Sequence, residues 1–302
     1  MAPQPERRYQ MSKSHERKLV RETLDRVGKN WSKASSTNAK LISRLKNIAQ
    51  YMATNQGLNS ITHMKTRHVD AYVAHLRDER HLAPSSLQGY ATAMRQLANT
   101  IGKSNIIRSN IELGANRSNA DRYKNANTPS DTAKLTEIRD GLYARAEWQG
   151  LAHEMQQLFG LRIKESLGSV NTIERDGRFF LHVPRGFAKN GLERLVPVES
   201  GAQRDLLDRV QAHCHNEGQR SLIPAAKSLK QGYWQQVNAI RDLGGTKKNN
   251  ANSHSLRREY IRERYAEIRE IPDREQRQEA EQGLIEQVGH FDTEKLRHYT
   301  PK

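Results

Sequence analysis

The sequence predicts a mainly α-helical protein with one small antiparallel β-sheet, and three observations lead to this fold class. Apolar residues recur at intervals of three and four over 36–102, which is typical of amphipathic helices. Three strand-like runs follow at 169–173, 178–183 and 194–198, with Asp-Gly and Asn-Gly turn signals between them. From residue 203 onward the pattern is helical again.

The N-terminal third divides into a basic segment and a helical domain. Residues 1–35 are polar and basic with little to bury, which predicts a basic arm, either mobile or a marginal helix. The first clear helix follows the candidate N-caps Ser36 and Thr37. A second helix covers 69–76, and a third begins after Pro84 and runs to about 101. We expect three or four short helices to form a first domain over 36–110.

A linker and a second domain complete the chain. Residues 111–131 are rich in Asn, Ser, Arg and Lys and predict a linker whose basic character suits a segment lying along DNA. The second domain, 132–302, begins with helical sequence to about 167 and continues into the three strands. A highly charged helical stretch covers 257–282.

The charge balance points to a polyanionic partner. The 302 residues include 50 Lys and Arg against 34 Asp and Glu, a formal net charge of +16 and a pI near 10.0. Nucleic acid is favoured over a membrane, because the charge is spread along the chain and no run of about 18 apolar residues offers a span. The single Cys214 excludes an intrachain disulfide, and the N-terminal residues lack the apolar core of a signal peptide. We expect a cytoplasmic protein.

Five local patterns occur in a fixed order in the second domain. Each has an ordinary structural explanation by itself, such as a surface ion pair, a solvated turn or a packed aromatic. Because all five occur together in one domain, in this order, we look for a single explanation. The patterns are Arg162 with Glu165 one turn later, Lys189 at a hairpin tip, His254 with Arg257 at i, i+3, His290 after Gly289, and Tyr299.

These residue types suit the cleavage of a phosphodiester without a metal. Two guanidinium groups, Arg162 and Arg257, would hold the non-bridging oxygens because each donates two parallel hydrogen bonds and stays charged. The phenol of Tyr299 would attack the phosphorus, with His254 helping to remove its proton. The product would be a 3′-phosphotyrosyl link.

The remaining candidates have supporting roles. Lys189 would protonate the leaving 5′ oxygen as a general acid, and His290 would donate a hydrogen bond to the same phosphate. Glu165 would hold Arg162 in place. No cofactor and no metal are expected, since the phosphotyrosyl link stores the energy for rejoining.

The five patterns resemble the catalytic domain of tyrosine recombinases, the phage integrase family. The segment 36–102, with its Leu-Ala-Pro-Ser-Ser sequence at 82–86, resembles the family's helical core-binding domain. The resemblance implies a SAM-like core-binding domain plus an α+β catalytic domain, closed as a clamp around duplex DNA. It also implies a homotetrameric synapse, strand exchange through a Holliday junction, and accessory DNA-bending or directionality proteins.

Two departures from the family pattern stand out. The stretch 257–290 is longer than usual, and its charged sequence predicts an inserted or extended helix that contacts DNA or a neighbour. Three residues follow Tyr299, whereas many relatives have a C-terminal helix there that docks into the next protomer. How protomers would couple therefore stays open.

Other interpretations remain beside a bacterial recombinase that integrates or excises a mobile element. A type IB topoisomerase uses a similar residue set to relax supercoils, and a regulator on the same fold binds DNA without cutting it. The His-Cys-His run at 213–215 is a poor metal site, because adjacent ligands diverge and no further cysteine is present. Asp70 and Asp292 lack the partners that a two-metal nuclease needs.

Overall fold

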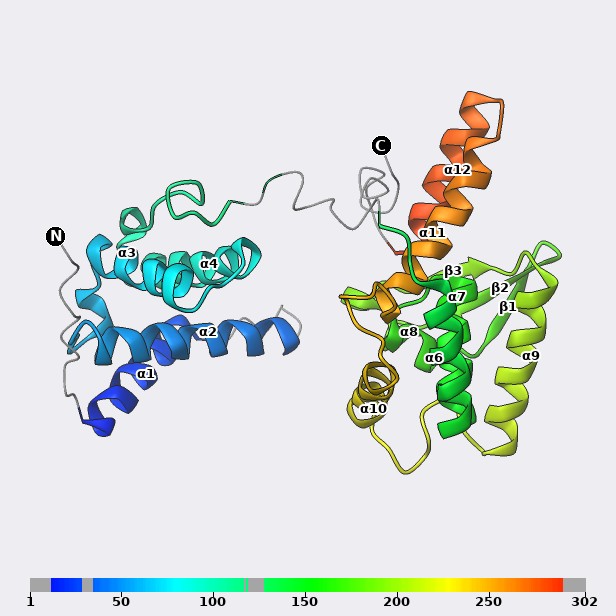
Figure 1. Ribbon diagram of the computed structural model, residues 1–302, viewed down its shortest axis with the longest axis horizontal. Helices are drawn as coiled ribbons and strands as arrows, with labels where there is room; N and C mark the ends of the chain where they lie inside the picture. The colour runs from blue at the N-terminus through cyan, green and yellow to red at the C-terminus, as the bar shows by residue number, and fades with distance from the viewer. Residues whose placement is uncertain (1–11, 29–34, 117, 119–127, 290–302) are drawn as a thin grey trace. The chain divides into compact units, whose positions relative to one another are not determined.

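The computed structural model describes residues 12–28, 35–116, 118 and 128–289 (Figure 1). The chain divides into two compact units, Met1–Asn119 and Ala120–Lys302. The first unit is helical and the second combines helices with a three-stranded sheet. The predicted fold class, mainly α with a small antiparallel sheet, is confirmed.

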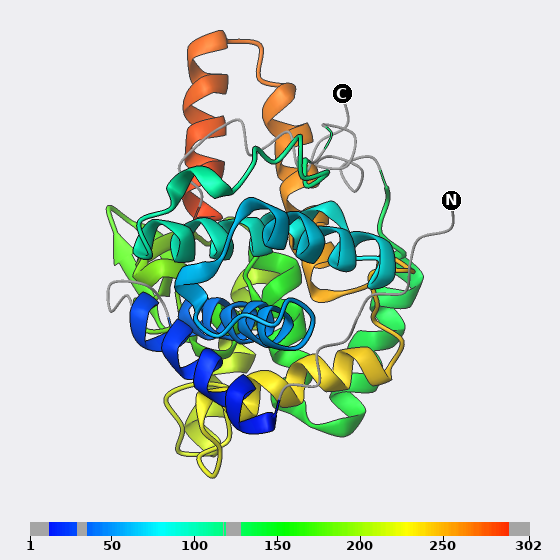
Figure 2. The same ribbon diagram turned by 90° about the vertical axis from the view of Figure 1, so that its left-hand side faces the viewer.

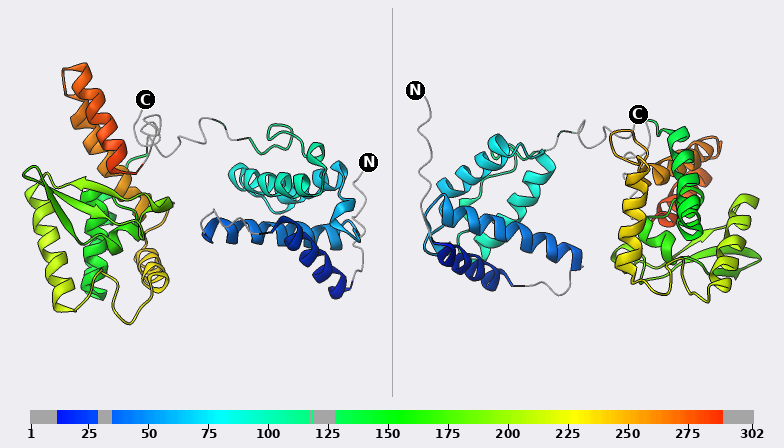
Figure 3. Two further views of the ribbon diagram at one scale, coloured as in Figure 1. Left: turned by 180° about the vertical axis from the view of Figure 1, so that it is seen from behind. Right: turned by 60° about the horizontal axis from the view of Figure 1, so that its bottom comes forward.

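Part of the segment expected to be a basic arm is a packed helix instead. α1 (Lys13–Val27) begins at Ser12, whose hydroxyl accepts a hydrogen bond from the backbone N–H of His15. Leu19 and Thr23 are buried, and Leu19 belongs to the core of the first unit. Figure 3 shows α1 lying against α2. Of the two alternatives expected for this segment, residues 13–27 therefore form the helix, because one buried stripe is enough to dock an otherwise charged helix.

The other helices of the first unit close around the same core. They are α2 (Ser35–Thr54), η1 (Ile61–His63), α3 (Thr66–Ala74), the π-helical turn η2 (His75–Glu79), α4 (Pro84–Thr100) and η3 (Ser104–Ile106). Pro84 stands at the first position of α4, where its missing N–H costs no hydrogen bond. Leu113 and Ala115 are buried in this core, which thus extends into the segment expected to be a linker.

Helices of the second unit pack against the small sheet. In chain order the elements are α6 (Thr132–Arg145), α7 (Glu147–Phe159), α8 (Ile163–Gly168), β1 (Thr172–Arg175), β2 (Arg178–Val183), η4 (Lys189–Gly191), β3 (Arg194–Pro197), α9 (Gly201–Asn216) and α10 (Leu229–Asp242). The strands are antiparallel in the order β1-β2-β3. Asp176 and Gly177 both have positive φ, 51° and 70°, as the two-residue turn joining β1 to β2 requires.

Two long helices end the described part of the second unit. α11 (Ser253–Arg269) and α12 (Arg274–Gln287) run antiparallel, side by side, and project from the body of the unit (Figures 1 and 2). Ile261, Ile268, Leu284 and Ile285 form the apolar seam between them. The charged stretch thus forms a helical hairpin that returns the chain to the sheet. Within the described ranges, no helix has the length and apolar character needed to cross a membrane.

Candidate functional site

A buried carboxylate lies at the centre of the candidate site. Glu165 is fully buried in the first turn of α8 and accepts a hydrogen bond of 3.0 Å from the backbone N–H of Arg162, which precedes the helix. Its position satisfies one of the free N–H groups at the helix start. α8 therefore begins with a negative charge that needs cationic partners.

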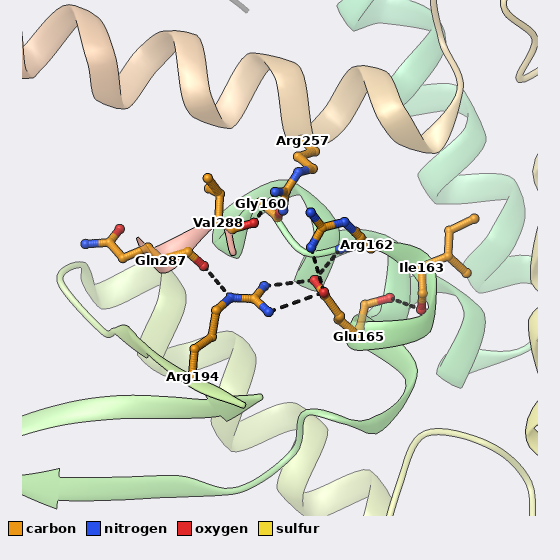
Figure 4. Close-up of polar contacts among 9 residues, drawn as sticks. Gly160, Arg162, Ile163, Glu165, Arg194, Arg257, Gln287 and Val288 are labelled. Atoms are coloured by element: carbon orange, nitrogen blue, oxygen red, sulfur yellow. Dashed lines mark hydrogen bonds and ion pairs between the residues drawn. The ribbon is translucent and has the colours of Figure 1, made fainter. Parts of the chain in front are cut away.

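Two arginines supply those partners (Figure 4). Arg162 Nη1 donates to Glu165 Oε1 at 2.8 Å. Arg194, from β3, donates to both carboxylate oxygens at 3.2 and 2.8 Å. Burial opposes ionisation of Glu165, but the hydrogen bonds and charges of Arg194 and Arg162 outweigh it and lower the pKa of Glu165 to about 2. The three groups carry a net charge of +1 at neutral pH.

Arg257 is held by backbone carbonyls on the same side of the unit. Its side chain projects from α11, and the residue is 1% exposed. Nη1 donates to the carbonyl oxygen of Gly160 at 2.5 Å, and Nη2 donates to the carbonyl oxygen of Val288. A cation is well placed at Val288 because the last carbonyls of α12 have no partner within the helix.

Gly160 creates the turn that brings these groups together. It ends α7 in the left-handed conformation, with φ 60° and ψ 25°, two residues before Arg162. A Cβ atom at this position would stand 2.4 Å from a ring carbon of Tyr260 on α11. Glycine is therefore required both by the backbone conformation and by the close approach of α11.

His254 lies one turn before Arg257, in the first turn of α11. Part of the residue is exposed and part is covered by the protein, and its backbone N–H donates to the side chain of Asn252, the N-cap, at 2.9 Å. Desolvation by the surrounding protein, together with the charges of Arg257 and Arg258, lowers the pKa of His254 to about 4. The imidazole is consequently neutral at pH 7 and able to accept a proton.

Lys189 occupies the exposed turn η4 between β2 and β3. The chain leading to it is anchored on α8, since Lys164 Nζ donates to the carbonyl oxygen of Gly186 at 2.8 Å. The ring of Phe187 covers Gly168, where a Cβ atom would come within 2.2 Å of it. The turn is therefore positioned by the helix that carries Glu165.

Figure 4 shows Arg162, Glu165 and Arg257 close together. His254 lies near enough to Arg257 and Arg162 for their charges to lower its pKa, and Lys189 stands on a turn braced by α8. His290 and Tyr299 lie outside the described residues. The described chain ends at Gly289, where a Cβ atom would be 3.3 Å from Arg194 Nη1 and 3.5 Å from Arg162 Nη1. His290 thus follows directly after a residue that contacts the arginine pair.

Sequence reasoning did not identify Arg194 as part of the site. Its signal was weak, because an arginine beginning a strand is usually exposed, whereas here the side chain is 9% exposed. Its partners are 29 and 93 residues away along the chain.

Among the described residues, no group of three or more His, Cys, Asp or Glu side chains could hold a metal ion.

Comparison with known proteins identifies the fold. No protein-family model and no curated protein matches the sequence. A structure of a lambda integrase tetramer bound to a Holliday junction matches with a TM-score of 0.61 and 14% identity, covering 94% of this chain and 76% of that one. A lambda integrase dimer bound to a COC′ core site matches with a TM-score of 0.60 and 15% identity, covering 90% of both chains. The chain therefore has the lambda integrase fold, and the resemblance to tyrosine recombinases expected from the sequence is confirmed at the level of fold.

Proposed function

We propose that this chain is a tyrosine-type site-specific DNA recombinase, which cleaves and rejoins duplex DNA through a 3′-phosphotyrosyl intermediate. The observation that carries the proposal is the cluster of Arg162, Arg257 and neutral His254 around the α7–α8 turn, on the lambda integrase fold. The net charge of +16 is suited to a DNA partner.

The proposed reaction is a phosphoryl transfer to Tyr299. The phenol oxygen forms a bond to phosphorus while the bond from phosphorus to the 5′ oxygen breaks. The phenol proton passes to His254, which is neutral at pH 7, although its lowered pKa makes it a weaker base than a free imidazole. Lys189 gives a proton to the leaving 5′ oxygen. Attack by a 5′ hydroxyl on the phosphotyrosine reverses these steps and joins a strand.

The arginines would stabilise the negative charge that develops on the phosphate during the reaction. Glu165 neutralises only one of the two charges on Arg162 and Arg194, so a positive charge remains for the phosphate. Arg257, whose side chain donates to the carbonyls of Gly160 and Val288, would supply the second positive charge. Negative charge that builds up on the non-bridging oxygens would be stabilised by both centres, with His290 donating a further hydrogen bond.

The domain roles follow from the same proposal. The helical first domain would hold the DNA core site, and the part from 132 to 302 would perform the chemistry. The lambda integrase structures contain a tetramer on a Holliday junction and a dimer on a core site. We propose a similar homotetrameric synapse here, acting in the bacterial cytoplasm to integrate or excise a mobile element, with accessory DNA-bending or directionality proteins.

Capture of covalent adducts tests the proposal. The protein is mixed with random duplexes carrying nicks, and DNA that stays attached through SDS is sequenced. Tyr299→Phe is run in parallel, with Tyr265→Phe on α11 as the matched control. We expect adducts that share a sequence with the wild type and the control, and none with Tyr299→Phe.

Two other results would replace the proposal. Adducts with no shared sequence would identify a type IB topoisomerase activity. Binding by wild type and Tyr299→Phe without any adduct would identify a DNA-binding regulator that keeps the fold and lacks the chemistry.

A further inference from the structure

Arg194 joins three elements of the second unit through a single side chain. From the start of β3, its Nη1 and Nη2 donate to the two oxygens of Glu165 on α8. Its Nε donates to the carbonyl oxygen of Gln287, the last residue of α12, at 2.6 Å. Figure 4 shows the guanidinium between these partners. All three nitrogens therefore donate to protein atoms.

The charge of Arg194 affects how tightly Glu165 holds Arg162, and therefore whether Arg162 can bind a phosphate. Glu165 is fully buried, and a buried carboxylate with one arginine partner would hold that partner tightly and cancel its charge. With Arg194 covering both carboxylate oxygens, Arg162 gives Glu165 one side-chain hydrogen bond and remains 21% exposed. Arg162 can thus share its guanidinium with an external anion.

Arg194 also fixes where α12 ends. The hydrogen bond from Nε satisfies a carbonyl that has no partner inside the helix. Gly289 follows two residues later, with φ of 63°, and packs against Arg194 and Arg162. The last described residues of the unit, Gln287 to Gly289, are therefore held next to Arg194.

We propose that Arg194 is a positioning residue for strand cleavage, which acts through Glu165 on Arg162 and holds the end of α12 against this pair. The inference rests on the proposed function and adds a residue to it. Lysine is no substitute, because one ammonium group lacks the planar fork that bonds both carboxylate oxygens while Nε bonds Gln287.

A double-variant experiment separates this role from simple structural support. Rates of adduct formation on a nicked core site and affinities for DNA are measured for wild type, Arg194→Gln, Arg194→Lys, Glu165→Gln and the double variant Arg194→Gln with Glu165→Gln. Arg178→Gln, an exposed arginine of β2, is the matched control.

We expect Arg194→Gln and Arg194→Lys to slow cleavage by about 100-fold while DNA affinity changes by less than about threefold. Removing the unpaired carboxylate should release Arg162, so the double variant should cleave about tenfold faster than Arg194→Gln alone. Arg178→Gln should cleave as the wild type does. A double variant no faster than Arg194→Gln, or an Arg194→Gln protein with the wild-type rate, would overturn the inference.

The acid titration of stability tests the same inference without using activity. The free energy of unfolding is measured from pH 2 to 7 for the same variants. Arg194→Gln should move the acid loss of stability to higher pH, because the pKa of Glu165 rises when Arg194 is lost, and Glu165→Gln should remove that change. If Arg194→Gln loses stability at the same pH as the wild type, the inference is overturned, whether or not the wild type forms adducts. If the pH of this loss does shift but the wild type forms no adducts, only the proposed function is overturned.

Discussion

Arg162 and Arg257 carry the same charge but are held in opposite ways. Arg162, at the start of α8, is partly exposed and paired with a carboxylate that a second arginine shares. Arg257, on α11, is buried and held by the carbonyls of Gly160 and Val288. The first arrangement depends on the ionisation of Glu165, and the second includes two backbone carbonyls, which do not titrate.

The two arginines therefore differ in their contribution to stability, although the sequence pattern suggests the same role for both. The burial of Arg257 makes it a structural tie between α11, the α7–α8 turn and the end of α12, in addition to a source of charge. Removal of Arg162 leaves Glu165 still paired with Arg194. Stability and activity should therefore respond together at Arg257 and separately at Arg162.

The largest effect is expected for Arg257→Gln. Loss of the guanidinium leaves two buried carbonyls without their partner, and the free energy of unfolding should fall by about 4 kcal/mol. Cleavage should become undetectable. Urea denaturation measures the stability change, with Arg269→Gln in the exposed last turn of α11 as the control, which should change it by less than about 0.5 kcal/mol. If both variants lower the free energy of unfolding by the same small amount, Arg257 does not hold α11 to the α7–α8 turn and the end of α12.

Arg162→Lys should separate activity from stability. We expect cleavage to slow by about 1,000-fold, because an ammonium group cannot donate two parallel hydrogen bonds to the phosphate. The free energy of unfolding should change by less than about 1 kcal/mol, since Arg194 keeps both of its bonds to Glu165. Single-turnover cleavage and urea denaturation of the same preparation provide the test. Loss of stability as large as that of Arg257→Gln would remove the distinction between the two arginines.

Acid should weaken the ion pairs of Glu165 with Arg162 and Arg194, but not the hydrogen bonds from Arg257 to the two carbonyls. The pKa of Glu165 is about 2 in the folded protein and 4.5 without these interactions. Its stabilising contribution is therefore complete above about pH 4.5 and is lost as the pH falls towards 2, a change of about 3 kcal/mol. Unfolding measured across this range should show the loss in wild type and not in Glu165→Gln. Identical acid profiles would show that Glu165 does not contribute as described.

The smallest effect concerns the carbonyl anchor of Arg257 at Gly160. Gly160→Ala places a Cβ atom 2.4 Å from the ring of Tyr260 in a left-handed conformation and should cost about 2 kcal/mol of unfolding free energy. Gly283→Ala in α12 is the matched control, because nothing lies within 4 Å of its Cβ and alanine favours the helix. Thermal unfolding of both variants checks the difference. A Gly160→Ala protein as stable as its control would show that this turn tolerates a side chain.

Much of the fold was predictable because its signals are local. The Asp176-Gly177 turn has the two positive φ angles that its sequence predicts, and the strand beginning at Arg178 ends at Val183 as expected. The packing of α1 was not predicted, because its charged residues outnumber its apolar ones and the burial of Leu19 depends on α2. Local patterns identify elements, while the docking of a charged helix requires a partner surface.

The candidate site was predictable only in part for the same reason. Arg162 with Glu165, and His254 with Arg257, are pairs at i, i+3, and spacing alone places each pair on one helical turn. Arg194 completes the cluster through contacts with residues 29 and 93 positions away, and no short pattern encodes them. The burial of Arg257 likewise depends on the return of α12 to the α7–α8 turn.

Identification of the residue that becomes attached to DNA tests the central claim most directly. Adducts formed on a nicked core site are treated with nuclease and trypsin, and the modified peptide is sequenced by mass spectrometry. Trypsin cleaves after Arg297, so we expect the mark of a 3′-phosphonucleotide on Tyr299 within 298–302. A nucleotide attached to any other residue, or no modified peptide from a protein that binds the site, would contradict the account.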